Sequence, residues 1–125
     1  MLSHNKEVGA GGEAFARSYL AKIGYTIIDS NVFSRWGELD IVAKKDNKVY
    51  FIEVKTRNNM RQGLPYEAVR IPKLFHLMRS INHYIKTRNL YKYRFQLDVI
   101  AIMLNSDQTL KYLRHYENIE VDRFF

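Results

Sequence analysis

Charged residues alternate with apolar residues on both sides of a turn-forming segment near the middle of the chain. Glu38 and Asp40 precede the sequence Lys45-Asp46-Asn47-Lys48, and Glu53 and Lys55 follow it. An alternation with a period of two is typical of β-strands, and Asp and Asn tolerate the left-handed conformations that a two-residue hairpin turn requires. The segment therefore predicts a β-hairpin in which Asp40 lies opposite Glu53 and Glu38 lies opposite Lys55.

This register places the four charged side chains on one face of the hairpin. On the other face it places the apolar side chains of Leu39, Ile41, Ile52 and Val54. Two opposed carboxylates repel each other, and at a Cβ separation of roughly 5 Å they suit a hard divalent ion such as Mg²⁺. Lys55 could act on a water molecule or a phosphate at that ion. The alternative interpretation is a solvent-exposed sheet face with ordinary charges.

A fourth candidate residue, Glu13, lies in the first predicted helix, from about Lys6 to Ile23. It shares a stripe at helical spacing with the apolar residues Ala16 and Leu20. This placement has two explanations. Glu13 either turns toward the charged face of the hairpin or is a helix-start glutamate favoured by the helix dipole.

The rest of the pattern predicts strands at 25–33, 95–104 and 109–116 and a second helix beginning near Pro72. The continuous apolar run Phe95–Leu104 is typical of a buried central strand. The resulting order is α-β-β-β-α-β-β, an α/β pattern in which helices flank a central sheet. A chain of 125 residues is most simply one domain, spanning 1–125.

The composition limits the classes of function. The chain has no cysteine, which excludes disulfides, zinc–thiolate sites and cysteine nucleophiles. A hydrophobic leader and an apolar run of membrane-spanning length are both absent, so a soluble, cytoplasmic protein without a membrane partner is expected. The net charge of +7 suggests a polyanionic partner, although such a charge also serves simply to keep many basic proteins soluble.

Basic residues are concentrated between Val54 and Leu97. This segment holds ten of the twenty lysines and arginines but one acid, Glu67. Tyrosine and phenylalanine are interleaved with them, as on nucleic-acid-binding surfaces, although each ring could equally pack in the core. A polar loop at 58–65 could reach over the charged face. We expect DNA phosphates to be contacted by Arg57, Arg61, Arg70, Lys73 and Arg79.

The spacing between Asp40 and the tripeptide Glu53-Val54-Lys55 resembles the motif of the PD-(D/E)XK nuclease superfamily. The predicted order of elements is also similar to the core of that superfamily, a mixed sheet in the restriction-endonuclease-like fold. A closer resemblance, from Gly12 to about Ile102, is to the YraN-like family of predicted endonucleases. The segments that carry it are Gly12-Glu13-x-x-Ala16, Gly37-Glu38-Leu39-Asp40, Phe51–Arg57, Glu67-Ala68-Val69 and Lys73.

This family is similar to archaeal Holliday-junction resolvases, and the resemblance implies a role for each acid. Glu13, Asp40, Glu53 and Lys55 would form the catalytic site, and the three acids would hold Mg²⁺ or Mn²⁺. The implied activity is metal-dependent endonucleolytic hydrolysis of phosphodiester bonds in DNA, including branched or junction DNA. Symmetric cutting of both strands at a junction would require a homodimer.

The chain departs from the family pattern at two places. Phe33 stands where many members of the family carry an arginine, and Gln96-Leu97 interrupts the usual Arg-Phe-Asp-Val string near Asp98. Asp98 lies on a buried strand, where a structural partner is favoured over a part in the site. Glu38 either positions Lys55 or contributes to a second metal.

Two other classes of function stay open. One is a catalytically inactive nucleic-acid-binding module with a nuclease-like fold, and the other is a protein-interaction adaptor with a basic surface.

Overall fold

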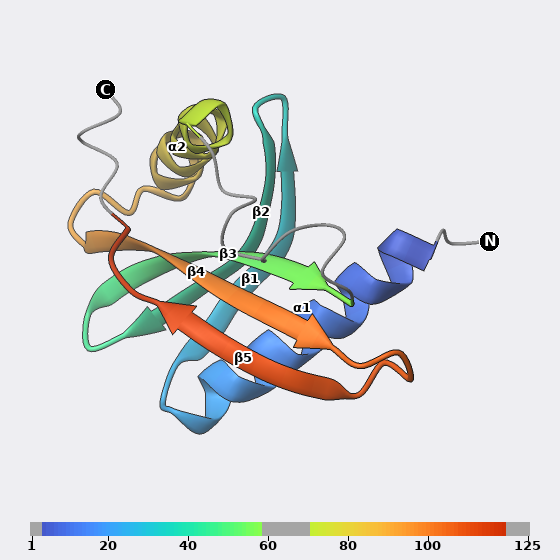
Figure 1. Cartoon of the computed structure of the whole chain (residues 1–125). Helices are drawn as coiled ribbons and strands as arrows, with labels where there is room; N and C mark the ends of the chain where they lie inside the picture. Colours follow the sequence, from blue (N-terminus) through green and yellow to red (C-terminus); the bar gives the residue numbers. More distant parts are fainter. Residues whose placement is uncertain (1–3, 59–70, 120–125) are drawn as a thin grey trace.

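The computed structural model describes residues 4–58 and 71–119, without the side chains at 4–10 and 71–74. Its elements are α1 (His4–Lys22), β1 (Thr26–Ser34), β2 (Gly37–Lys45), β3 (Lys48–Arg57), α2 (Ile71–Arg88), β4 (Arg94–Leu104) and β5 (Leu110–Tyr116) (Figure 1). This is the predicted order, and each element begins close to its predicted start.

The hairpin formed by β2 and β3 has the predicted turn and register. Asp46 and Asn47 form the turn with φ angles of 50° and 62°, as a type I′ turn requires. Lys45 pairs with Lys48, and the antiparallel ladder continues to the pair Ile41–Ile52. Asp40 and Glu53 therefore lie one residue beyond the last pair of this ladder.

The described strands form one five-stranded sheet in the order β1-β2-β3-β4-β5. β3 and β4 are parallel, whereas the other neighbouring strands are antiparallel. A parallel pair requires a crossover connection, and here the crossover contains α2 (Figure 1). The fold is therefore α/β with a mixed central sheet flanked by helices, an arrangement consistent with the restriction-endonuclease-like fold.

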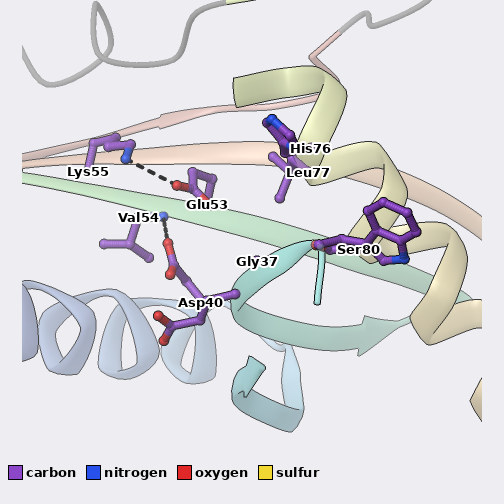
Figure 2. Close-up of a pocket in the computed structure, with 10 residues that line it drawn as sticks. Gly37, Asp40, Glu53, Val54, Lys55, His76, Leu77 and Ser80 are labelled. Atoms are coloured by element: carbon purple, nitrogen blue, oxygen red, sulfur yellow. Dashed lines mark hydrogen bonds and ion pairs between the residues drawn. The ribbon is translucent and has the colours of Figure 1, made fainter. Parts of the chain in front are cut away.

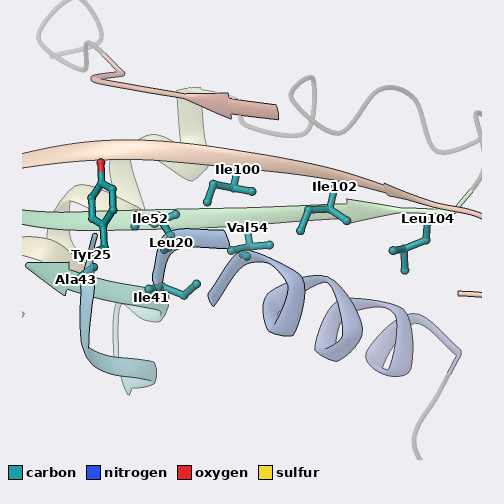
Figure 3. Packing of buried hydrophobic residues seen from close by; sticks show 10 residues of the cluster. Leu20, Tyr25, Ile41, Ala43, Ile52, Val54, Ile100, Ile102 and Leu104 are labelled. Carbon is teal, nitrogen blue, oxygen red and sulfur yellow. The ribbon is translucent and has the colours of Figure 1, made fainter. Parts of the chain in front are cut away.

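The two helices cover opposite faces of the sheet. Leu20 on α1 belongs to a buried cluster with Ile52 (Figure 3), whereas Ile81 on α2 belongs to a second cluster with Phe51, the preceding residue of β3. Side chains that alternate along a strand point to opposite faces, so β3 contributes to both clusters. Neither helix has the length and apolar character needed to cross a membrane in its described residues.

Helix α1 approaches β3 closely at Gly12. A Cβ atom built on Gly12 would lie 1.9 Å from Oγ1 of Thr56, so a larger residue fits only if the helix or the strand shifts. Ala16, about one turn further along, is fully buried. These small residues bring α1 close to the sheet and place Glu13, next to Gly12, near the ends of the hairpin strands.

The alternation predicted for β2 is wrong at Leu39. Leu39 packs in the α2 cluster, whereas Ile41 packs in the α1 cluster. Strict alternation holds only within a regular ladder, and the β2–β3 ladder ends at Ile41. Beyond that residue β2 remains paired, among the described strands, only with β1, and Glu38 lies opposite Phe33. The predicted pairing of Glu38 with Lys55 is therefore also wrong.

Candidate active site

A pocket of about 300 Å³ opens where β2 and β3 separate. The β1–β2 turn and the amino-terminal part of α2 form its other walls. Its lining residues, most of them labelled in Figure 2, are Trp36, Gly37, Glu38, Asp40, Glu53, Val54, Lys55, His76, Leu77 and Ser80. The structure thus brings Asp40, Glu53 and Lys55 together in one pocket.

Asp40 is held in this pocket by the main chain of β3. Its Oδ2 atom accepts a 2.8 Å hydrogen bond from the backbone N–H of Val54 (Figure 2). In a continued ladder this N–H would donate to a main-chain carbonyl of β2. Because the ladder ends at Ile41, the carboxylate takes the place of that carbonyl, and the end of the hairpin orients it.

The proximity of Asp40 and Glu53 changes the protonation of Asp40. Burial, followed by the negative charge of Glu53, raises the pKa of Asp40 to about 8, although the hydrogen bond from Val54 acts in the opposite direction. Glu53 itself is only 4% exposed. Without a cation, the pair formed by Asp40 and Glu53 therefore retains a proton to higher pH than isolated acids do. A divalent cation between the two groups would favour the ionised form of both.

Glu13 and Glu38 add two carboxylates next to Asp40. One oxygen from each of these three acids lies within 4.8 Å of the others. The side-chain nitrogen of Asn31, oriented toward the acids, donates to Glu13 Oε2 at 2.9 Å and to Glu38 Oε1 at 2.8 Å. Burial and the charge of Glu38 raise the pKa of Glu13, and Arg17, 3.9 Å from Glu13, lowers it in part.

The position of Glu13 decides between its two explanations. Helix α1 begins at His4, so Glu13 lies well beyond the first turn, where the helix dipole no longer favours an acid. The tight contact at Gly12 instead directs the neighbouring Glu13 toward Asp40. The interpretation that Glu13 faces the hairpin acids is confirmed.

Lys55 is paired with Glu53 inside the pocket. Its Nζ atom lies 3.2 Å from Oε1 of Glu53 (Figure 2), and the side chains of Lys55 and Glu53 are only 15% and 4% exposed. The ion pair keeps the ammonium group beside the acids, since the low exposure denies it full hydration.

The donor set fits a hard divalent cation. Glu13, Glu38 and Asp40 present carboxylate oxygens close together, and Glu53 adjoins Asp40. Mg²⁺ and Mn²⁺ prefer carboxylate and water oxygens to nitrogen or sulfur ligands. Mutual repulsion among these acids is the feature that such an ion would relieve.

The predicted DNA-contacting residues are only partly described. Arg57 lies at the end of β3, where its Nη1 atom donates to the carbonyl of Thr56 at 2.9 Å, and Arg79 is exposed on α2. Arg61 and Arg70 lie outside the described residues, as does the loop at 58–65 from residue 59 onward. The side chain of Lys73 also lies outside them.

Asp98 lies outside the pocket and has structural partners. The favoured interpretation of Asp98 as a structural residue is therefore confirmed. It is fully buried on β4 and accepts hydrogen bonds from His115 Nε2 at 2.7 Å, Gln96 Nε2 at 2.8 Å and the Asn118 N–H at 2.9 Å. Burial by itself would raise the pKa of Asp98, but these hydrogen bonds outweigh burial and lower it. The carboxylate therefore links β4 to β5 and to the segment after it.

The comparison with known proteins identifies the family. The chain belongs to the Uncharacterised protein family UPF0102, whose model matches residues 12–102. It is 40% identical over 106 residues to a UPF0102 protein of Clostridium kluyveri, a similarity that covers 85% of this chain and 87% of the relative. A UPF0102 protein of Clostridium acetobutylicum is 40% identical over 114 residues, or 91% and 93% of the two chains.

A third relative, a UPF0102 protein of Caldanaerobacter subterraneus, is 37% identical over 116 residues, which cover 92% of this chain and 95% of the relative. The family match extends from Gly12 to Ile102. It therefore contains all the acids of the pocket, Lys55 and the helix α2 that closes the pocket.

Sequence reasoning did not predict several residues of the pocket wall. Trp36, Ser80 and His76 line it, and Glu38 joins the acids by way of β1 and Asn31 instead of facing Lys55. Trp36 carried one usable signal, because it directly precedes the segment Gly37–Asp40. His76 and His83 belong to no group of potential metal ligands among the described residues.

Proposed function

We propose that this protein is a metal-dependent endonuclease that hydrolyses phosphodiester bonds in DNA. The observation that carries the proposal is the convergence of Glu13, Glu38, Asp40 and Glu53 beside Lys55 in a single region. A surface that only binds DNA gains nothing from acids placed where phosphates approach, because like charges repel. A site that holds a divalent cation requires such acids.

In this proposal Asp40, Glu53 and Glu13 hold Mg²⁺ or Mn²⁺. The bound ion would polarise the scissile phosphate and lower the pKa of a water molecule. Asp40 is oriented for this role by the N–H of Val54. Glu38, which shares the donor Asn31 with Glu13, is an additional ligand or keeps Glu13 in position.

Lys55 acts on the substrate in this scheme. Its ammonium group is fixed by Glu53 at 3.2 Å, so it can donate hydrogen bonds to the attacking water or to the phosphate oxygens on which charge develops. The protein therefore supplies a preorganised positive group beside the metal ligands. This division of roles resembles that of the PD-(D/E)XK nucleases.

DNA is the proposed substrate because the chain carries a net charge of +7, although the pocket itself is acidic. Basic residues around an acidic centre neutralise the phosphates that flank the scissile bond. Branched and junction DNA are the proposed forms, and a homodimer is the proposed assembly for cutting two strands.

The test is cleavage of labelled single-stranded, duplex, flapped and four-way-junction DNA with Mg²⁺, Mn²⁺ or EDTA. We expect cleavage with metal only. Glu53→Gln should reduce the rate by at least about 100-fold, because removing one group that stabilises the transition state typically costs this much. Lys55→Ala should reduce cleavage similarly while leaving metal affinity nearly unchanged, since Lys55 does not contact the ion.

Matched controls come from the far edge of the sheet. Glu117→Gln and Lys111→Ala remove the same charges from exposed positions on or next to β5 and should keep full activity. Cleavage by the Glu53→Gln and Lys55→Ala variants at the parent rate would reject this site. A parent protein that binds all these DNAs but cuts none with either metal would favour the inactive binding module instead.

A further inference from the structure

The turn between β1 and β2 projects an arginine and a tryptophan at the mouth of the pocket. Arg35 and Trp36 are the two turn residues between the paired Ser34 and Gly37. The hydroxyl of Ser34 accepts a 3.2 Å hydrogen bond from the Trp36 N–H and donates to the carbonyl of Gly37 at 3.3 Å. Gly37 has a φ of 127°, which glycine adopts without strain. The turn is therefore held in one shape.

Two guanidinium groups lie over the ring of Trp36. The Cζ atom of Arg35 lies 4.5 Å from the ring centroid, and the Cζ atom of Arg79 on α2 lies 4.6 Å from it. Arg79 also lies 4.8 Å from the ring centroid of Phe75. We call Arg35, Trp36, Arg79 and Phe75 the aromatic–arginine stack. It joins two elements that are distant in the sequence, the β1–β2 turn and α2.

This stack adjoins the acids of the candidate active site. Trp36 lines the same pocket as Asp40 and Glu53. The turn also lies close to α2 behind the stack, since a Cβ atom on Gly37 would be 3.8 Å from the hydroxyl of Ser80. A nucleotide next to the phosphate at the acids would therefore lie within reach of Trp36.

The charges of the stack are complementary to DNA. Neither Arg35 nor Arg79 forms an ion pair with a carboxylate in the part of the chain that the structure describes. A guanidinium group that lies over an aromatic ring keeps N–H donors for other partners, and its fork of donors matches phosphate oxygens. The stack is accessible to solvent, because Trp36 is only partly buried, Arg79 is exposed and Phe75 is 40% exposed.

We propose that the aromatic–arginine stack binds an unpaired nucleotide next to the scissile phosphate. The base adds to the stack, because bases stack on aromatic rings and on guanidinium planes. The phosphate of that nucleotide accepts hydrogen bonds from Arg35 and Arg79. A base within a continuous duplex is covered by its neighbours on both sides, so it cannot join the stack. This inference rests on the proposed function and narrows its substrate to DNA with unstacked nucleotides, such as single strands, flaps and open junction centres.

Trp36 is the single tryptophan of the chain, so fluorescence excited beyond the absorption band of the tyrosines reports on this site alone. In EDTA, which prevents cleavage, we would titrate the parent protein with a single-stranded oligothymidylate of about a dozen nucleotides. A blunt duplex of the same length is the comparison. We expect the single strand to quench Trp36 and to protect it from iodide, and the duplex to do so only weakly.

Substitutions at Trp36 and Arg79 distinguish the contribution of base stacking to DNA affinity from that of charge. Anisotropy of a dye-labelled oligothymidylate should show at least about fivefold weaker binding for Trp36→Ala, the lower limit for losing one base–ring stack. Trp36→Phe should keep most of the affinity. Arg79→Ala should weaken binding and reduce the salt slope by about one, whereas Trp36→Ala should leave that slope unchanged. Circular dichroism and thermal unfolding verify that each variant is folded.

The matched controls repeat the same contact at the opposite edge of the sheet. The Cζ atom of Arg114 lies 5.1 Å from the ring centroid of Tyr112 on β5. Arg114→Ala and Tyr112→Ala should change the affinity by less than about twofold, a change within ordinary surface effects.

Three results would overturn the inference. They are equal quenching by single strand and duplex, binding of Trp36→Ala within twofold of the parent, and no binding of the parent to either DNA. Failure of the proposed function is a separate result, because it is absence of cleavage with metal. If the protein shows the expected quenching but never cleaves DNA, the nucleotide-binding role of the stack is supported and the proposed nuclease activity is rejected.

Discussion

At the scale of single residues, the candidate site is defined by the cost of placing Asp40 beside Glu53. The ordinary pKa of an aspartate is near 3.8, and burial together with Glu53 raises the pKa of Asp40 to about 8. Between these two values the folded protein holds a proton that the unfolded chain has lost. The contribution of Asp40 therefore makes the protein less stable as the pH rises from about 4 to about 8.

Asp40→Asn should remove this dependence. In EDTA we expect the variant to gain stability relative to the parent as the pH rises, with a higher Tm above about pH 8 and little difference near pH 5. At and above about pH 8 the gain should reach several kcal/mol, because each pH unit between the two pKa values costs the parent about 1.4 kcal/mol. The amide oxygen can still accept the hydrogen bond from Val54. Added Mg²⁺ should raise the Tm of the parent and have much less effect on the variant.

Thermal unfolding at several pH values, with and without Mg²⁺, provides the measurement. Asp46→Asn is the matched control, because Asp46 lies in the exposed β2–β3 turn and Asn suits that turn equally well. A Tm difference between Asp40→Asn and the parent that stays constant with pH would contradict the raised pKa.

At the scale of elements, the contact between α1 and β3 controls where Glu13 lies. Gly12→Ala should force the helix away from Thr56, since its Cβ would lie 1.9 Å from Oγ1. We expect a loss of about 1–3 kcal/mol in the free energy of unfolding. Cleavage should also weaken, because Glu13 moves with the helix.

Gly11→Ala is the matched control for that substitution. A Cβ on Gly11 meets nothing within 4 Å, so alanine there should raise stability by up to about 1 kcal/mol through helix propensity. Urea unfolding and the cleavage assay measure both effects. Equal behaviour of the two alanine variants would show that the close approach at Gly12 is not needed.

The sequence predicted the elements whose signals are local. The Asp46-Asn47 turn determined the register of β2 and β3, and the continuous apolar run identified β4 as a buried strand. The predicted orientations of Leu39 and Glu38 were wrong, because the alternation was extended past the end of the β2–β3 ladder at Ile41. The end of a ladder depends on the neighbouring strand and helix, and a period-two pattern carries no information about either.

The walls of the pocket depend on contacts between distant parts of the chain. Trp36 and Arg79 meet because the β3–α2–β4 crossover brings α2 against the β1–β2 turn. Neither residue has a local signal for this contact. Asp98 could be recognised as a buried acid in need of a partner, but His115 as that partner follows from the pairing of β4 with β5.

At the scale of the whole molecule, the chain carries a net charge of +7 although its pocket is lined by acids. We expect DNA affinity in EDTA to fall at least tenfold between about 50 and about 200 mM salt, since bound lysines and arginines release counterions. Anisotropy with a labelled duplex and a labelled single strand measures the slope. Affinity that stays flat with salt would reject the electrostatic account and favour contacts through neutral groups.

The parallel pairing of β3 with β4 also bears on the order in which the chain folds. α1 and the β1–β2–β3 meander form a continuous stretch, His4–Arg57, that contains every acid of the pocket. β4 can join only after a long loop has closed, which is slow. The acids would thus repel one another within an early, partly folded chain. Mg²⁺ should then accelerate refolding in stopped-flow experiments, whereas an unchanged rate would mean that the acids meet only after β4 has docked.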